Sequence, residues 1–427
     1  LLSRRQRQMC IRDRFNPEND MALACGDSYY MPPASARRMA ADLSVLPAWY
    51  AAPGDAVLTD TLLHGEQVKN LSPLLPAVEF VTGLSSSYTK ISPWGWNPSL
   101  LRRLREAGIT NQACLTDEEM KRIRELSGRQ TAVHVLSAIR KKKWLHSASA
   151  VSEYDCVMED FLTLPEGTDT NVPFVGESFL FHTENEVESF VRSHPSAVLK
   201  SPWSGSGRGI QYTSGEFTRP LKGWVQHVLH TQQAVVGEPF YDKVKDFAME
   251  FFSNGKGKVR FIGYSLFETD KRGIYKENLL ATDDDILGKL SAYVPASVFR
   301  LLCRRLTIEL AHTIGEYEGY LGVDMMICRT PLAKTGYAIH PCVEINLRMN
   351  MGVVARMVYD RYVCDRVQGR YIIEYYTSPG EAEQADRSLR LQHPLLIEEG
   401  RIKSGYLSLT PIGQQTAYQA YILIGST

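Results

Sequence analysis

The sequence predicts a mixed α/β (α+β) protein made of several folded units. Three observations favour this class. The chain has 427 residues, more than one ordinary hydrophobic core holds; short apolar strands alternate with amphipathic helices; and no internal repeat is present. The 44% hydrophobic and 22% charged residues are typical of a soluble globular protein. No apolar run approaches the length of about 20 residues that spans a bilayer, so we expect no membrane segment.

Charge and cysteine usage exclude several classes of partner. The first fourteen residues carry five arginines and one aspartate, although the formal net charge of the chain is zero. We expect residues 1–14 to be a disordered basic tail or sequence foreign to the natural protein. Arginine clusters interleaved with aromatics are absent, so no nucleic-acid surface is expected. The eight cysteines form no C-x-x-C pair or Cys/His cluster, and there is no secretion signal, so we expect reduced thiols, no structural zinc and a cytoplasmic location.

An α/β domain is expected over residues 15–125. Apolar runs predict strands over residues 56–59 and 77–81, and leucines at helical spacing predict a helix over residues 98–107. Further along, apolar periodicity predicts helices over residues 129–142 and 184–192.

A phosphate-binding loop is the first chemical hypothesis. Lys200 ends an apolar strand, and a Gly/Ser-rich segment that contains an arginine follows it. Glycine lets the backbone approach a polyphosphate closely, while lysine and arginine neutralise its charge. The glycine spacing fits neither the dinucleotide fingerprint nor the P-loop, and a flexible turn without a ligand is the alternative. The candidate residues are Lys200, Ser204, Gly205, Ser206, Gly207 and Arg208.

Two more strands and a long helix are expected before the next candidate site. An Asn-Gly-Lys-Gly turn separates apolar runs at residues 246–252 and 259–266, which predicts a hairpin. Residues 301–317 have the pattern of an amphipathic helix.

A magnesium site is the second chemical hypothesis. Apolar and polar residues alternate in Val-Glu-Ile-Asn-Leu-Arg, which places Glu344, Asn346 and Arg348 on one face of a strand. A turn over residues 329–336 would fold this strand onto the preceding one and bring Asp324 beside Glu344. Carboxylate and amide oxygens suit a hard cation. A solvated polar face of an antiparallel pair is the alternative.

These segments together resemble the ATP-grasp superfamily over about residues 80–365. Arg129 opens a helix where the family commonly has a phosphate-contacting lysine, and Lys200 with its loop is similar to the family's strand lysine and lid. Asp324 with the E-x-N pair and the following arginine looks like the family's metal site, although 20 positions separate Asp324 from Glu344, more than is common. A fourth segment looks like the hinge that reads adenine and ribose, with the candidates Glu238, Phe240, Tyr241 and Asp246.

The resemblance implies ATP as the nucleotide and Mg²⁺, or Mn²⁺, as the metal, held by Asp324, Glu344 and Asn346. It implies phosphorylation of a small-molecule carboxylate to an acyl phosphate, followed by attack of an amine or a thiol. Lys200 and Arg129 would bind phosphates, and Arg348 would stabilise charge on the transferring group, so Lys200 and Arg348 are the catalytic candidates. A phosphotransferase acting on a hydroxyl and a non-catalytic ATP-binding protein remain alternatives.

Two expectations complete the interpretation. His340 precedes Pro341 near the metal strand, and a lone histidine there is expected to be structural. The expected organisation is a tail (1–14), a Rossmann-like α/β domain (15–125), an N-terminal ATP-grasp subdomain with the phosphate loop (126–236), a C-terminal subdomain with the metal site (237–370) and a C-terminal extension (371–427).

Overall fold

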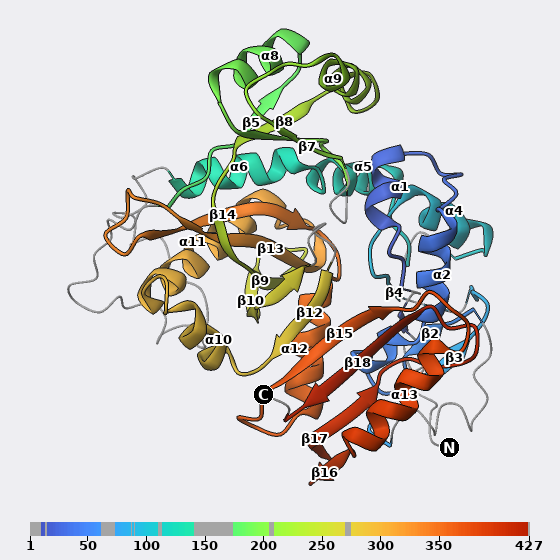
Figure 1. Cartoon of the computed structure of the whole chain (residues 1–427). Helices are drawn as coiled ribbons and strands as arrows, with labels where there is room; N and C mark the ends of the chain where they lie inside the picture. The colour runs from blue at the N-terminus through green and yellow to red at the C-terminus, as the bar shows by residue number, and fades with distance from the viewer. Residues whose placement is uncertain are drawn as a thin grey trace. The chain divides into compact units, whose positions relative to one another are not determined.

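A computed structural model of the chain describes residues 10–12, 15–60, 73–86, 88, 90–109, 113–140, 174–204, 209–269 and 275–425. Its contacts divide the chain into two units. Figure 1 labels the helices and strands along the chain. The first unit comprises Leu1–Glu125, Phe267–Thr282 and Leu347–Thr427, and the second comprises Leu126–Leu266 and Asp283–Asn346. Residues 347–370, expected with the metal-site subdomain, and residues 371–427, expected as an extension, therefore both belong to the first unit.

The N-terminal part of the first unit contains a four-stranded sheet whose strands all run parallel. The order is β3 (Glu79–Val81), β2 (Ala56–Leu58), β1 (Cys10–Arg12) and β4 (Lys90–Ser92). Parallel strands are what the Rossmann-like expectation requires. β1 differs from the tail expected over residues 1–14, because its backbone pairs with β2 on one side and β4 on the other.

Helices follow the short strands of this unit. They are α1 (Asn19–Cys25), α2 (Ala34–Asp42), a 3-10 turn (Leu46–Trp49), α4 (Pro98–Glu106) and α5 (Asp117–Leu126). α4 begins where its sequence predicts, since the Asn97 side chain accepts a hydrogen bond from the Leu100 N–H and Pro98 occupies the first turn.

The C-terminal part of the first unit is a six-stranded antiparallel sheet. Its order is β11 (Phe267–Thr269), β12 (Tyr275–Leu280), β15 (Gly369–Tyr375), β18 (Tyr418–Ile424), β17 (Arg401–Ser408) and β16 (Leu396–Glu398). The helices α12 (Met351–Tyr362) and α13 (Glu381–Gln392) pack on it. The buried Trp49 indole donates to the Leu409 carbonyl at 2.6 Å, which ties the two parts of the unit together.

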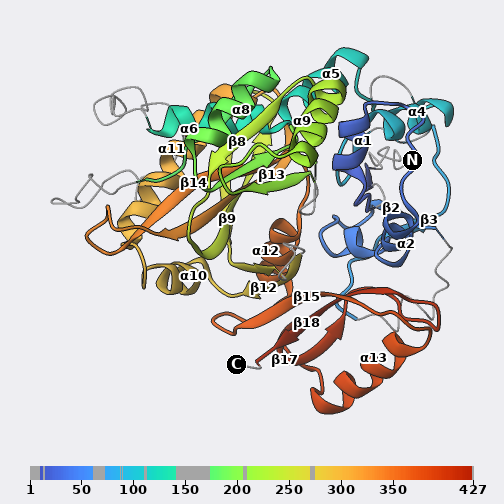
Figure 2. The ribbon, with the colours of Figure 1, turned by 45° about the horizontal axis from the view of Figure 1, so that its top comes forward.

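The second unit contains two four-stranded sheets. The first has the order β5 (Phe179–Phe181), β8 (Val235–Pro239), β6 (Ala197–Lys200) and β7 (Ile210–Thr213), and all its pairs are antiparallel. The helices α8 (Glu184–Ser193) and α9 (Arg219–Gln232) lie together over this sheet (Figure 2) and share an apolar core with it.

The second sheet of this unit is also antiparallel. Its order is β10 (Val259–Ser265), β9 (Lys243–Asn254), β13 (Glu318–Arg329) and β14 (Tyr337–Asn346). The helices are α6 (Arg129–Arg140), α10 (Asp283–Leu290) and α11 (Ala296–Ile314). The predicted hairpin between β13 and β14 is present, and Asp324 lies directly opposite Glu344. Among the described helices, none is long and apolar enough to cross a membrane.

Candidate nucleotide and metal site

Lys200 forms a buried ion pair at the end of β6. Its Nζ donates to Glu238 Oε2 at 2.5 Å, and the two side chains are only 8% and 6% exposed. Glu238 comes from the neighbouring strand β8, and the Ser178 hydroxyl donates to its other oxygen at 3.1 Å. Burial alone would raise the pKa of Glu238, but the Lys200 ammonium, aided by further polar neighbours, lowers it below its ordinary value. The acid is therefore ionised at neutral pH.

Arg129 connects the segment after Lys200 with the metal strand. Its guanidinium is 5% exposed, and Nη1 donates to both the Ser201 carbonyl and the Ser204 hydroxyl at 2.6 Å. Nη2 donates to Glu344 Oε1 on β14 at 3.0 Å. A planar guanidinium carries donors in several directions, so it can hold three acceptors where an ammonium on a flexible stem is less suited.

The three metal candidates lie together on the hairpin of β13 and β14. Asp324 faces Glu344 across the pair, and the Asn346 amide nitrogen donates to Asp324 Oδ2 at 3.0 Å. The amide oxygen is the atom of Asn346 whose chemistry suits a hard cation. Among the described residues, no group of three or more His, Cys, Asp and Glu side chains is arranged to hold a metal. Two carboxylates and an amide oxygen are nevertheless a donor set that fits Mg²⁺, which keeps part of its water shell.

The hinge candidates follow Glu238 along the chain. Phe240 is exposed, whereas the Tyr241 hydroxyl accepts a hydrogen bond from the Glu177 N–H at 2.8 Å. Burial raises the pKa of Tyr241 to about 12. Asp246, on β9, accepts a hydrogen bond from Lys243 Nζ at 2.6 Å. The candidates Gly205, Ser206, Gly207 and Arg208 lie outside the described residues.

Arg348 belongs to the first unit, where it forms a bidentate ion pair. Its Nε and Nη2 donate to the two carboxylate oxygens of Asp20 at 2.8 and 2.6 Å. Asp20 lies in the first turn of α1 and was not a sequence candidate. Asp20 and Arg348 are 328 positions apart in the chain, so the local E-x-N motif could not indicate that Asp20 is the partner of Arg348.

His340, which the sequence predicts to be structural, lies outside the candidate motifs. Its side chain is completely buried on β14, and neither ring nitrogen has a hydrogen-bond partner in the described part of the chain. Burial lowers the pKa of its imidazole to about 4.

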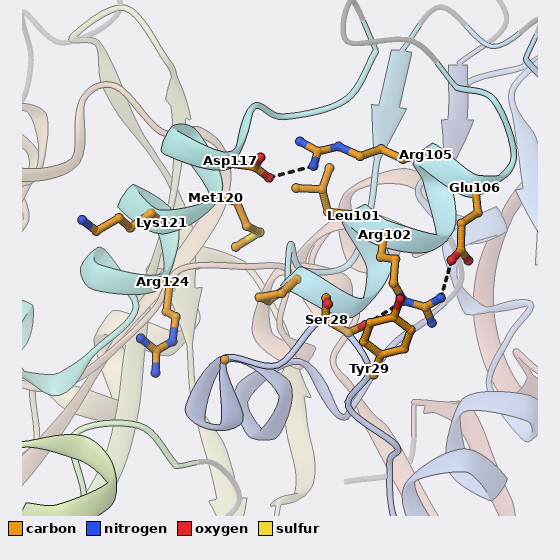
Figure 3. A pocket seen from close by; sticks show the side chains of 12 residues that line it. Ser28, Tyr29, Leu101, Arg102, Arg105, Glu106, Asp117, Met120, Lys121 and Arg124 are labelled. Atoms are coloured by element: carbon orange, nitrogen blue, oxygen red, sulfur yellow. Dashed lines mark hydrogen bonds and ion pairs between the residues drawn. The ribbon is translucent and has the colours of Figure 1, made fainter.

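A separate pocket of about 710 Å³ lies in the first unit (Figure 3). Two of its arginines are bound to acids of the same pocket, Arg102 to Glu106 at 2.6 Å and Arg105 to Asp117 at 2.7 Å. None of the sequence candidates lines it. Because the charges of these two arginines are paired, neither gives a strong signal for an anionic ligand.

Comparison with known proteins shows which solved structures share the fold. No protein-family model matches the chain, and no curated protein matches it in sequence. Among solved structures, biotin carboxylase from Campylobacter jejuni in a complex with β,γ-ATP superposes with a TM-score of 0.50 at 11% identity, covering 97% of this chain and 87% of that one. N5-carboxyaminoimidazole synthetase from Staphylococcus aureus, complexed with ADP, gives a TM-score of 0.46 at 11% identity over 98% and 93%. At this identity the likeness concerns the fold alone: the chain shares the fold of this biotin carboxylase.

Proposed function

We propose that this chain is an ADP-forming, Mg²⁺-dependent ligase that joins a small-molecule carboxylate to an amine or a thiol. The observation that carries the proposal is the bridge made by Arg129. One guanidinium holds Ser201 and Ser204, directly after the Lys200 strand, and also Glu344 of the acidic hairpin. A phosphate-binding segment and a cation-binding hairpin within reach of one side chain are the two halves of a nucleotide–metal site.

The residues have distinct roles in the proposed reaction. Asp324, Glu344 and Asn346 would hold Mg²⁺, which neutralises phosphate charge when it is bound. Lys200 and Arg129 bind and orient the phosphates, while Glu238 holds the Lys200 ammonium at the strand end. Little covalent chemistry falls to the protein, so alignment and charge neutralisation are its main contributions.

Arg348 is proposed to stabilise charge on the transferring phosphoryl group. The γ-phosphoryl group passes to a carboxylate oxygen of the substrate and ADP leaves. The amine or thiol then attacks the acyl carbon and displaces inorganic phosphate. Preorganised positive charge at such a position typically contributes about 10²–10³ in rate.

ADP release assayed with pools of carboxylates and nucleophiles tests the function. A ligase forms ADP only when both substrate classes are present. ADP formed with a hydroxyl compound alone would assign the protein as a phosphotransferase, and ADP formed under no condition would leave a nucleotide-binding protein. Lys200→Ala and Glu344→Ala should each abolish turnover, whereas Lys256→Ala, at an exposed turn of the second unit, should not.

A further inference from the structure

The pocket of the first unit is a cavity that the proposed function does not use. Its volume of about 710 Å³ lies within the range of about 300–1,000 Å³ that is typical of small-molecule sites. Three segments form it: the chain after α1, which includes Tyr29, and the helices α4 and α5 (Figure 3). The described residues that line it include none of the nucleotide or metal candidates, so a ligand bound here would occupy a second site.

The floor of the pocket is apolar. Pro98 and Leu101 come from the start of α4, and Met120 comes from α5. The side chains of Leu101 and Met120 are buried and lie between the two helices (Figure 3). The exposed ring of Tyr29 adds an aromatic face at the rim. These surfaces favour a ligand with an apolar body, because binding removes apolar surface on both sides from water.

The charged side chains around this floor are unequal in number. Four basic side chains line the pocket against two acidic ones: Arg102, Arg105, Lys121 and Arg124 against Glu106 and Asp117. The excess of positive charge remains when both acids are ionised. A concave surface with one sign of charge in excess attracts ligands of the opposite sign, so the pocket favours an anion over a cation.

The two acids are also more exposed to water than the arginines with which they pair. Glu106 is 57% exposed and Arg102 is 29% exposed, while Asp117 is 87% exposed and Arg105 is 36% exposed. Water screens the acids more than the arginines, and ion pairs of this kind are weak. The pairing therefore cancels only part of the positive charge that a ligand in the pocket meets.

Both guanidiniums are held in place and still have N–H groups to donate. Arg102 lies over the Tyr29 ring, with Cζ 4.4 Å from the ring centroid, and its Nε donates to the Ser28 carbonyl at 2.9 Å. Arg105 donates through Nη2 to the Leu115 carbonyl at 3.1 Å. Within the described residues, these bonds and the two ion pairs leave further N–H groups on each guanidinium. An arginine that is already fixed loses little conformational freedom when it binds an oxyanion.

We propose that this pocket binds a small organic anion, in which a carboxylate, sulfonate or phosphate is attached to an apolar body. The anionic group lies against Arg102 and Arg105, and the apolar body lies against Leu101, Met120 and the Tyr29 ring. The site lies within one unit and shares no residue with the nucleotide candidates, so binding here does not depend on the proposed function.

Fluorescence titration of the full chain with two dyes tests the inference. Anilinonaphthalene sulfonate is an aromatic anion, and phenylnaphthylamine has the same rings without the sulfonate. The wild type should bind both dyes, and saturating MgADP should change neither titration. Arg105→Met removes one guanidinium but keeps an apolar side chain. We expect it to weaken the anionic dye about tenfold, the typical effect of one charge-assisted hydrogen bond, and to leave the neutral dye within about twofold.

Matched variants separate a pocket contact from a general effect. Arg103→Met makes the same change on α4 at a residue that does not line the pocket, and should alter neither affinity. Tyr29→Ala removes the aromatic face, so both dyes should bind about threefold more weakly. Thermal unfolding reports whether each variant folds. If Arg105→Met does not fold, Arg102→Met makes the same test at the second guanidinium.

Four results would overturn the inference. Wild-type affinity for the anionic dye in both Arg105→Met and Arg102→Met excludes the guanidiniums as its partners. An equal loss of both dyes in these variants assigns the arginines a structural role. Displacement of the anionic dye by MgADP places its binding at the nucleotide site, and a wild type that binds neither dye excludes a ligand pocket. A chain that fails to bind MgADP rejects the proposed function but leaves the dye titrations interpretable.

Discussion

Two ion pairs of the second unit, Lys200–Glu238 and Arg129–Glu344, contain the same chemistry in different surroundings. In the first pair both side chains are sealed from water, at 8% and 6% exposure. In the second the guanidinium is buried at 5%, but the carboxylate is 31% exposed. A carboxylate sealed against a lysine has no side open to a metal ion, whereas a carboxylate that still faces solvent can take up a cation. From this comparison we propose that Glu238 holds the Lys200 ammonium and that Glu344, rather than Glu238, binds the metal.

The largest effect on stability is expected when the buried Lys200–Glu238 pair is broken. Glu238→Ala leaves the Lys200 ammonium buried without its counter-charge, and we expect a loss of about 3–5 kcal/mol in the free energy of unfolding. Urea denaturation measures it. The double variant Lys200→Met/Glu238→Leu removes both charges and should recover most of the stability. A double variant as unstable as Glu238→Ala would contradict a buried-charge origin of the loss.

The next effect in size is expected when the pH is lowered, because the buried His340 makes the free energy of unfolding depend on pH. His340 has a pKa of about 4 in the folded protein and 6.5 ordinarily, so between these values only the unfolded state gains its proton. Stability should therefore fall by about 2–3 kcal/mol as the pH drops from 6.5 to 4. His340→Phe should lack this share of the decline. Glu238 adds a further loss that begins near its ordinary pKa of 4.5 and continues below it, because its pKa is lowered in the folded protein and its protonation removes the charge that pairs with Lys200. If the free energy of unfolding of His340→Phe falls between pH 6.5 and 4 as steeply as that of the wild type, then His340 does not have a lowered pKa in the folded protein.

An intermediate effect is expected for the Arg129–Glu344 pair, whose carboxylate is partly exposed to solvent. Arg129→Met removes the donors that hold Ser204 and Glu344, and should weaken MgADP about tenfold to a hundredfold, as measured by calorimetry. Arg129→Lys keeps the charge but not the fork, so its affinity should lie between those of the wild type and Arg129→Met. If lysine restores full affinity, charge alone matters and the three-way bridge does not.

The smallest effect on stability is expected for the Arg348–Asp20 ion pair of the first unit. The side chains of Arg348 and Asp20 are 18% and 25% exposed, and ion pairs reached by water contribute about 1 kcal/mol or less. Asp20→Asn should shift the free energy of unfolding by no more than that, while altering turnover because the arginine loses its bidentate orientation. Unchanged turnover would show that Asp20 does not position Arg348.

The sequence predicted the parts of the site that local periodicity determines. Alternation along residues 343–348 placed Glu344 and Asn346 on one strand face, and the turn after Arg329 aligned Asp324 with Glu344. The glycine-rich segment drew attention to Lys200. Each of these signals lies within about 25 residues of chain.

The rest depends on contacts between distant segments, which no periodicity encodes. Lys200 and Glu238 meet because β6 and β8 pair antiparallel, and Arg129 reaches Glu344 across 215 positions. Likewise, the basic composition of residues 1–14 predicted a tail, whereas the backbone of β1, within this segment, pairs with β2 and β4. His340 gave only the sequence signal of a lone histidine; that its ring nitrogens have no hydrogen-bond partner among the described residues follows from packing that the sequence does not encode.

Calorimetric titration of ADP with and without Mg²⁺, in the wild type and in Glu344→Gln, tests most directly that the lysine strand and the acidic hairpin form one site. The wild type should bind ADP at least about tenfold more tightly when Mg²⁺ is present. Glu344→Gln should lose that gain while keeping the metal-free affinity that Lys200 supports. An equal Mg²⁺ gain in both proteins would contradict a shared nucleotide–metal site.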